Sequence, residues 1–109
     1  MLEPILGSES SERVLIFILA REQGYATEIA RQFNTALYSI QEQLEKLEVG
    51  GVLVSQTAGR TRLYSFNPRY PFLNELKGLL SKALSFYPQA EREQLLMNRR
   101  RPRRRGKPV

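Results

Sequence analysis

The feature that most constrains the fold is a pair of amphipathic helical patterns separated by a short break. The first, ATEIARQF at residues 26–33, puts its apolar side chains on one face, and the second, ALYSIQEQLEKLE at residues 36–48, repeats them at spacings of three and four. Asn34 and Thr35 interrupt the pattern, and either side chain can cap the second helix. A short helix, a tight turn and a longer helix predict a helix-turn-helix unit.

The residues that follow predict a β-hairpin. Gly50 and Gly51 stop the longer helix, and two segments rich in β-branched and aromatic residues, VLVSQ and TRLYSF, flank TAGR. Gly59 permits the positive φ that a tight hairpin turn requires, and Asn67-Pro68 closes the second arm. A hairpin directly after a helix-turn-helix unit is expected to form a wing.

Two further helical patterns flank this unit. SESSERVLIFILARE predicts a helix that Ser8 caps and Gly24 ends, and its residues 14–20 are apolar on every side. We expect the burial of this helix to need a second subunit, because the chain is small. The pattern at residues 70–88 has a wide apolar face, which favours a core plus a dimer seam over a core alone. That face consists of Phe72, Leu73, Leu76, Leu79, Leu80, Ala83, Leu84 and Tyr87.

The order of these elements predicts an α+β fold, mainly α, namely a winged helix-turn-helix with flanking N- and C-terminal dimerisation helices. We expect residues 1–88 to form that domain and residues 89–98 to add a short helical extension, weakly anchored by Leu95, Leu96 and Met97. Residues 99–109 are expected to form a basic tail that is disordered when unbound.

The charge of the chain is concentrated at its C-terminal end. The net charge is +6, yet residues 1–98 carry ten Lys and Arg against eleven Glu. Residues 99–109, RRRPRRRGKPV, carry six Arg and one Lys and no acid. A nearly neutral body with a strongly basic tail indicates a nucleic acid or another acidic partner.

The composition excludes several kinds of chemistry. The chain has no Cys, His or Asp, which excludes disulfides, His- or Cys-based catalysis and most transition-metal sites. We see no phosphate loop and therefore expect neither an enzyme nor a cofactor. No apolar run reaches the roughly 18 residues of a membrane span. These features favour a cytoplasmic protein.

Three segments resemble the ArsR-like winged-helix transcriptional regulators. ILGSESSERVLIFIL is similar to their opening helix, and ATEIARQFNTALYSIQEQLEKLEVGGVLVSQTAGRTRLYSFNP to their helix-turn-helix and wing. NPRYPFLNELKGLL resembles a subgroup often associated with nucleotidyltransferase domains. The resemblance, over residues 5–87, implies a homodimer that binds double-stranded DNA. It does not imply metal sensing, because the Cys and His ligands of the metal-sensing members are absent.

The candidate DNA contacts lie on four segments. They are Arg31 on the short helix, Thr35, Tyr38, Ser39, Glu42 and Lys46 on the longer helix, Arg60 and Arg62 on the wing, and Arg99, Arg100, Arg101, Arg103, Arg104, Arg105 and Lys107 in the tail. Glu42 can accept from cytosine N4, but glutamates also repel phosphate. We therefore expect the tail to supply attraction while the longer helix and the wing select the site. Alternatively, Glu42, Glu45 and Glu48 only solvate a helix face and pair with nearby residues.

Two functions remain open from the sequence. The first is a homodimeric, sequence-specific transcription regulator, a repressor that occupies a palindromic site. The second is a winged-helix protein-protein interaction module, or an antitoxin-like partner of a nucleotidyltransferase. In that case the Arg-rich tail would bind an acidic partner or RNA.

Overall fold

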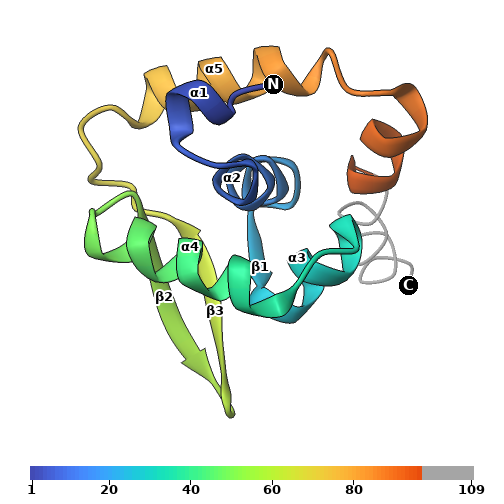
Figure 1. The fold of residues 1–109 in the computed structure, drawn as a ribbon. Coiled ribbons are helices and arrows are strands. Elements are labelled where there is room, and N and C mark those ends of the chain that lie inside the picture. Colours follow the sequence, from blue (N-terminus) through green and yellow to red (C-terminus); the bar gives the residue numbers. More distant parts are fainter. Residues whose placement is uncertain (97–109) are drawn as a thin grey trace, which may run out of the picture.

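The computed structural model describes residues 1–96 (Figure 1). It confirms the predicted α+β, mainly α, winged-helix fold, with residues 89–96 forming a further helical segment. None of the helices in this part of the chain is both long and apolar enough to cross a membrane. The labelled elements are α1 (Glu3–Leu6), α2 (Glu9–Arg21), β1 (Gln23–Tyr25), α3 (Ala26–Phe33), α4 (Leu37–Val49), β2 (Leu53–Ala58), β3 (Thr61–Phe66) and α5 (Leu73–Leu84).

Helix α2 is the centre of the fold, and Figure 1 views it end-on with the other helices around it. Ser8 caps it as predicted, because the Ser8 hydroxyl accepts the Ser11 N–H at 3.1 Å. Residues 14–18 are almost completely buried by α1, α3, α4, α5 and the sheet of the same chain. The expectation that this burial needs a second subunit is therefore wrong. The sequence shows that the helix is apolar all round but not which elements cover it.

The predicted end of this helix at Gly24 is also wrong. The helix ends at Arg21, and Glu22 adopts the left-handed conformation with φ of 75°. Gly24 lies in β1 instead, where a Cβ atom would come within 2.6 Å of Cε1 of Phe17. Gly24 is therefore needed for a close approach between β1 and the ring of Phe17, not for ending a helix.

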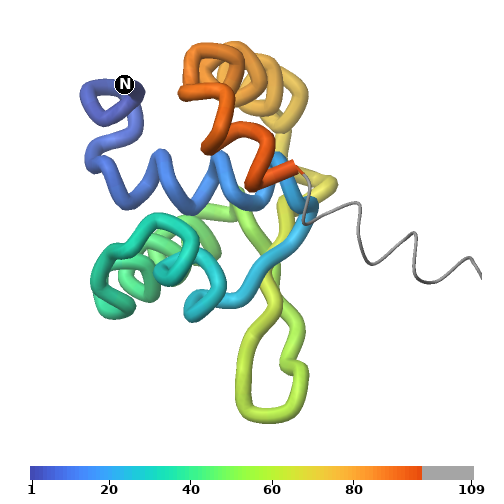
Figure 2. The backbone as a smooth tube through the Cα atoms, turned by 90° about the vertical axis from the view of Figure 1, so that its right-hand side faces the viewer, coloured from blue at the N-terminus to red at the C-terminus, as the bar shows by residue number. Residues whose placement is uncertain are grey.

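The sheet has three antiparallel strands in the order β1-β3-β2, whereas the sequence predicted only the β2–β3 hairpin. The additional strand β1 pairs Tyr25 with Leu63, and it is too short to show an alternating pattern. The hairpin turn follows the prediction, with Gly59 at φ of 66° and Ala58 opposite Thr61. Figure 2 shows the hairpin projecting from the body as a wing.

The helix-turn-helix unit consists of α3 and α4. The predicted cap is wrong, because α4 begins after Ala36 without a side-chain cap. Asn34 instead ends α3 in the left-handed conformation, with φ of 50°. Ile40 and Leu44 of the predicted apolar seam are fully buried, and Gly50-Gly51 follows the end of α4 as predicted.

The C-terminal part packs against α2. Helix α5 is shorter than the predicted pattern, and Phe72 and Phe86, which flank it, remain exposed. Leu95 is fully buried, and its carbonyl oxygen accepts from Nε of Arg21 at 3.1 Å. Met97 and the basic tail at residues 99–109 lie outside the described residues.

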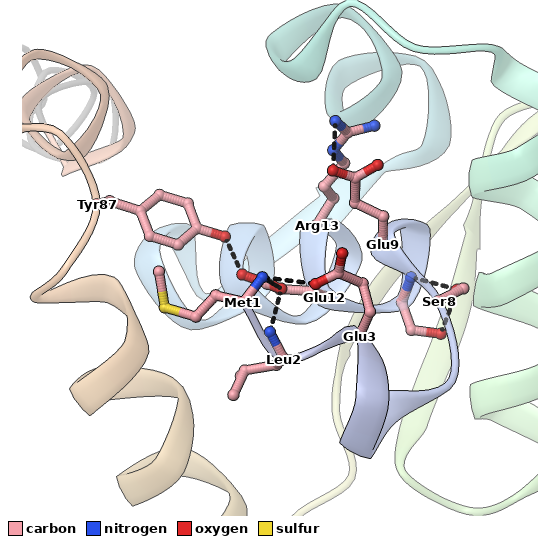
Figure 3. A network of polar contacts seen from close by, with 9 residues as sticks. Met1, Leu2, Glu3, Ser8, Glu9, Glu12, Arg13 and Tyr87 are labelled. Atoms are coloured by element: carbon pink, nitrogen blue, oxygen red, sulfur yellow. Dashed lines mark hydrogen bonds and ion pairs between the residues drawn. The ribbon is translucent and has the colours of Figure 1, made fainter.

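A buried carboxylate ties the N-terminal segment and the segment that follows α5 to α2 (Figure 3). Glu12 is 4% exposed and accepts hydrogen bonds from the Leu2 N–H at 2.7 Å and the Tyr87 hydroxyl at 2.6 Å. Burial raises the pKa of Glu12, but these bonds and the N-terminal ammonium of Met1 outweigh it, leaving a pKa below the ordinary 4.5. Burial and the bond to Glu12 raise the pKa of Tyr87, so its hydroxyl stays a donor at neutral pH.

Candidate nucleic-acid interface

Helix α4 presents a polar face to solvent opposite its buried seam. Tyr38 is 71% exposed, Glu42 and Lys46 are also exposed, and Ser39 is half-buried. Thr35 is half-buried too, but it lies in the turn before α4 and not on the helix as predicted. The seam fixes this orientation, since Ile40 and Leu44 pack into the core. The side chains near the start of α4 are therefore accessible to a partner that approaches this face.

A groove of about 550 Å³ runs between α4 and the wing. It brings together four of the predicted site residues from two elements, namely Tyr38, Glu42, Arg60 and Arg62. Arg31, Thr35, Ser39 and Lys46 do not line it, although Arg31 is exposed on α3. The predicted tail residues Arg99, Arg100, Arg101, Arg103, Arg104, Arg105 and Lys107 lie outside the described residues.

Two tyrosines that the sequence analysis did not select also line the groove. Tyr25 stands at the start of α3, where its N–H donates to the Glu28 carboxylate at 3.0 Å. Tyr64 lies on β3 and is mostly buried, and burial raises the pKa of its hydroxyl, with a further contribution from the charge of Glu48. The two-residue alternation from Arg62 to Tyr64 could have indicated Tyr64, because it puts both side chains on one face of the strand.

The two wing arginines have different surroundings. Arg60 stands in the turn, is exposed, and makes no ion pair with any residue in 1–96. Arg62 lies on β3, and its Nη1 is 3.8 Å from a carboxylate oxygen of Glu48 at the end of α4. Ser55 of β2, which the sequence analysis also missed, bridges this pair.

The groove combines aromatic faces, guanidinium groups and carboxylates. Such a set can contact bases and phosphates, because guanidinium groups bind phosphate oxygens while hydroxyl and carboxylate groups bind base edges. The described residues include no cluster of three or more acidic side chains that could hold a metal ion. Together, the aromatic, guanidinium and carboxylate groups can contact a polar partner.

Comparisons with known proteins show the fold. No protein-family model and no curated protein matches the sequence. A structure of a ZitR double mutant from Lactococcus lactis in the apo form superposes with a TM-score of 0.54 at 18% identity, over 91% of this chain and 83% of that one. A second structure of that mutant gives a TM-score of 0.51 at 15% identity, over 92% of this chain and 76% of that one. The described residues thus share the winged-helix fold of ZitR.

Proposed function

We propose that the protein is a sequence-specific regulator of transcription that binds double-stranded DNA as a homodimer. The observation that carries this proposal is the groove in which Tyr38 and Glu42 of α4 face Arg60 and Arg62 of the wing. In a winged helix-turn-helix, the second helix of the unit lies in the major groove. A wing arginine can grip phosphate or enter the adjacent minor groove.

Base contacts are assigned to the N-terminal half of α4, which is the part of such a helix that usually meets base edges. The hydroxyl groups of Thr35, Tyr38 and Ser39 can donate or accept, and Glu42 can accept from cytosine N4. Lys46 stands further along the same exposed face and is assigned to phosphate, as is Arg31 on α3. Helices α3 and α4 together carry four Glu against one Arg and one Lys, so the helix-turn-helix unit provides selectivity while its own net charge is negative.

Attraction to DNA is assigned to the tail, whose six arginines and one lysine outweigh every other local charge. The anchoring of the preceding residues supports this assignment. Arg21 donates to the Leu95 carbonyl at 3.1 Å and to the Gln32 side chain of α3 at 3.0 Å. Leu95, near the end of the described residues, is therefore connected through Arg21 to the first helix of the helix-turn-helix unit.

The interface of the homodimer is assigned to the surface opposite the wing. Helices α1 and α5 lie at that end of the molecule (Figure 1, Figure 2). Ile5 of α1 is exposed there, and Phe72 and Phe86 are exposed beside the two ends of α5. A two-fold dimer would set two α4 helices about one DNA turn, roughly 34–36 Å, apart and would select a palindromic site. The dimer is proposed to repress transcription by occupying such a site within a promoter.

The finer assignments rest on the sequence resemblance. Membership of the ArsR-like group and an association with a nucleotidyltransferase stay predictions from residues 5–87. Zinc sensing is not part of our proposal, because this chain has neither Cys nor His.

Selection of bound fragments from a random duplex library tests this function. The full chain is expected to enrich a palindrome whose half-sites are one helical turn apart. Enrichment of no sequence would contradict a sequence-specific regulator.

The exposed carboxylates of Glu42 and Glu45 on α4 favour a second candidate, a protein-interaction module. An acidic helix face suits a basic protein partner better than it suits phosphate. The two candidates differ in a gel-shift assay, because a module of this kind would not shift a duplex at moderate salt.

A further inference from the structure

Three polar side chains form a connection between α4 and both strands of the wing. Glu48 lies in the last turn of α4, Ser55 on β2 and Arg62 on β3. The Ser55 hydroxyl donates to a carboxylate oxygen of Glu48 at 2.7 Å and accepts from Nη1 of Arg62 at 2.9 Å. The same carboxylate oxygen lies 3.8 Å from Nη1 of Arg62.

This connection directs the Arg62 side chain away from the tip of the wing. Arg62 is paired across the hairpin with Thr57, whereas Ser55 is paired with Tyr64, further from the turn. To reach Ser55, the guanidinium group must therefore extend back along the hairpin towards α4. Arg60 in the turn has no such restraint within residues 1–96.

The pair is too exposed to matter much for folding. The side chain of Arg62 is 58% exposed and that of Glu48 is 33% exposed. Ion pairs of this kind contribute little to stability, because water and salt screen them. The guanidinium group has five N–H donors, and Ser55 takes one of them, so it remains accessible to a phosphate. A phosphate that binds it must compete with the charge of Glu48.

We propose that Glu48 is a positioning residue that holds Arg62 through Ser55 and competes with DNA phosphate for it. This inference rests on the proposed function and adds to it that Glu48 regulates the contact between Arg62 and DNA. The competition lowers sequence-independent affinity at the wing, so that the contacts of α4 weigh more in selecting the site. It also gives an acidic residue of the DNA-facing helix a specific task.

The test is binding of a mixed-sequence duplex by the full chain, measured by fluorescence anisotropy across a salt series. Glu48→Gln is expected to bind about two- to fivefold more tightly, the effect of a partly exposed ion pair. Its slope of log K against log salt should steepen by up to about 0.9, the value for one neutralised phosphate. Ser55→Ala, which removes the bridge without changing charge, should shift affinity in the same direction by less.

The matched control is Glu45→Gln, because Glu45 lies on the same helix and lines the groove but makes no ion pair in the described residues. It removes the same charge and should raise affinity less than Glu48→Gln. Arg62→Gln should weaken binding more when combined with Glu48→Gln than in the wild type, since only there is the guanidinium group released. This non-additivity is the signature of the competition.

Four results would be decisive against the inference. If Glu48→Gln and Glu45→Gln raise the affinity for duplex equally, Glu48 does not control Arg62. The same conclusion holds if Arg62→Gln weakens binding equally in the wild type and in Glu48→Gln. Weaker binding by Glu48→Gln would show that Glu48 assists the contact instead. If neither the wild type nor any variant binds duplex at low salt, the proposed function fails and this inference fails with it.

Discussion

The hydroxyl of Tyr87, which follows α5, donates a 2.6 Å hydrogen bond to a carboxylate oxygen of Glu12 on α2 (Figure 3). The backbone N–H of Leu2 donates to the other oxygen of the same carboxylate at 2.7 Å. The segments before α2 and after α5 are thereby fixed to the helix against which α4 packs.

Replacing Tyr87 with Phe tests this contact. The change removes one donor from a buried carboxylate and keeps the ring. It should lower the free energy of unfolding by about 1.5–3 kcal/mol, the usual value for a hydrogen bond to a charged group. Urea unfolding followed by circular dichroism measures the change. An unchanged midpoint would mean that the bond contributes nothing.

The buried carboxylate of Glu12 should make the stability of the fold depend on pH. The pKa of Glu12 is lowered in the folded chain, so its contribution to stability is complete above the ordinary value of 4.5 and is lost as pH falls through the folded-state pKa. Glu12→Gln should therefore be less stable than the wild type at pH 7, with a difference that narrows below about pH 4.5. Urea midpoints across this range test it, and a constant difference would contradict it.

Two glycines provide a matched test of packing. Gly24→Ala puts a Cβ 2.6 Å from the ring of Phe17 and should destabilise the fold by about 1–3 kcal/mol. Gly78→Ala in α5 meets nothing within 4 Å and should stabilise it by up to about 1 kcal/mol. Thermal unfolding should show a lower midpoint for Gly24→Ala and a higher midpoint for Gly78→Ala than for the wild type. Equal effects would remove the role assigned to the Gly24–Phe17 approach.

The tail has a prediction of its own. Deleting residues 99–109 removes seven positive charges and should flatten the salt dependence of duplex binding, by about 0.9 in slope for each phosphate that the tail neutralises in the full chain. The fold should be unaffected, as the thermal midpoint will show. An unchanged slope would mean that attraction resides in the helix-turn-helix unit and wing.

The sequence was sufficient to predict the elements whose patterns are local. The periodicity of residues 26–33 matches α3, Ser8 is a cap, and Gly59 stands in the wing turn. Strand β1 was missed because its three residues have no pattern, and they pair only because β3 offers an edge. The role of Gly24 depends on Phe17 across the fold, which no local signal reports.

The site could be predicted only in part for the same reason. Helical geometry was enough to select Tyr38 and Glu42 for the exposed face of α4, and turn chemistry placed Arg60 at the wing. The coupling of Glu48 to Arg62 was not predictable, because it depends on the packing of the hairpin against the end of α4. The sequence analysis attributed the burial of α2 to a second subunit. It did so because an apolar pattern does not show which elements will cover the helix.

The central claim is that DNA contacts the face formed by α4 and the wing, and an NMR titration tests it most directly. At 12.6 kDa the chain suits a ¹⁵N-labelled experiment with the duplex enriched in the selection. We expect the largest shifts at Tyr38, Ser39, Glu42, Arg60 and Arg62. Shifts confined to α1 and α5, or none in the presence of excess duplex, would contradict the claim.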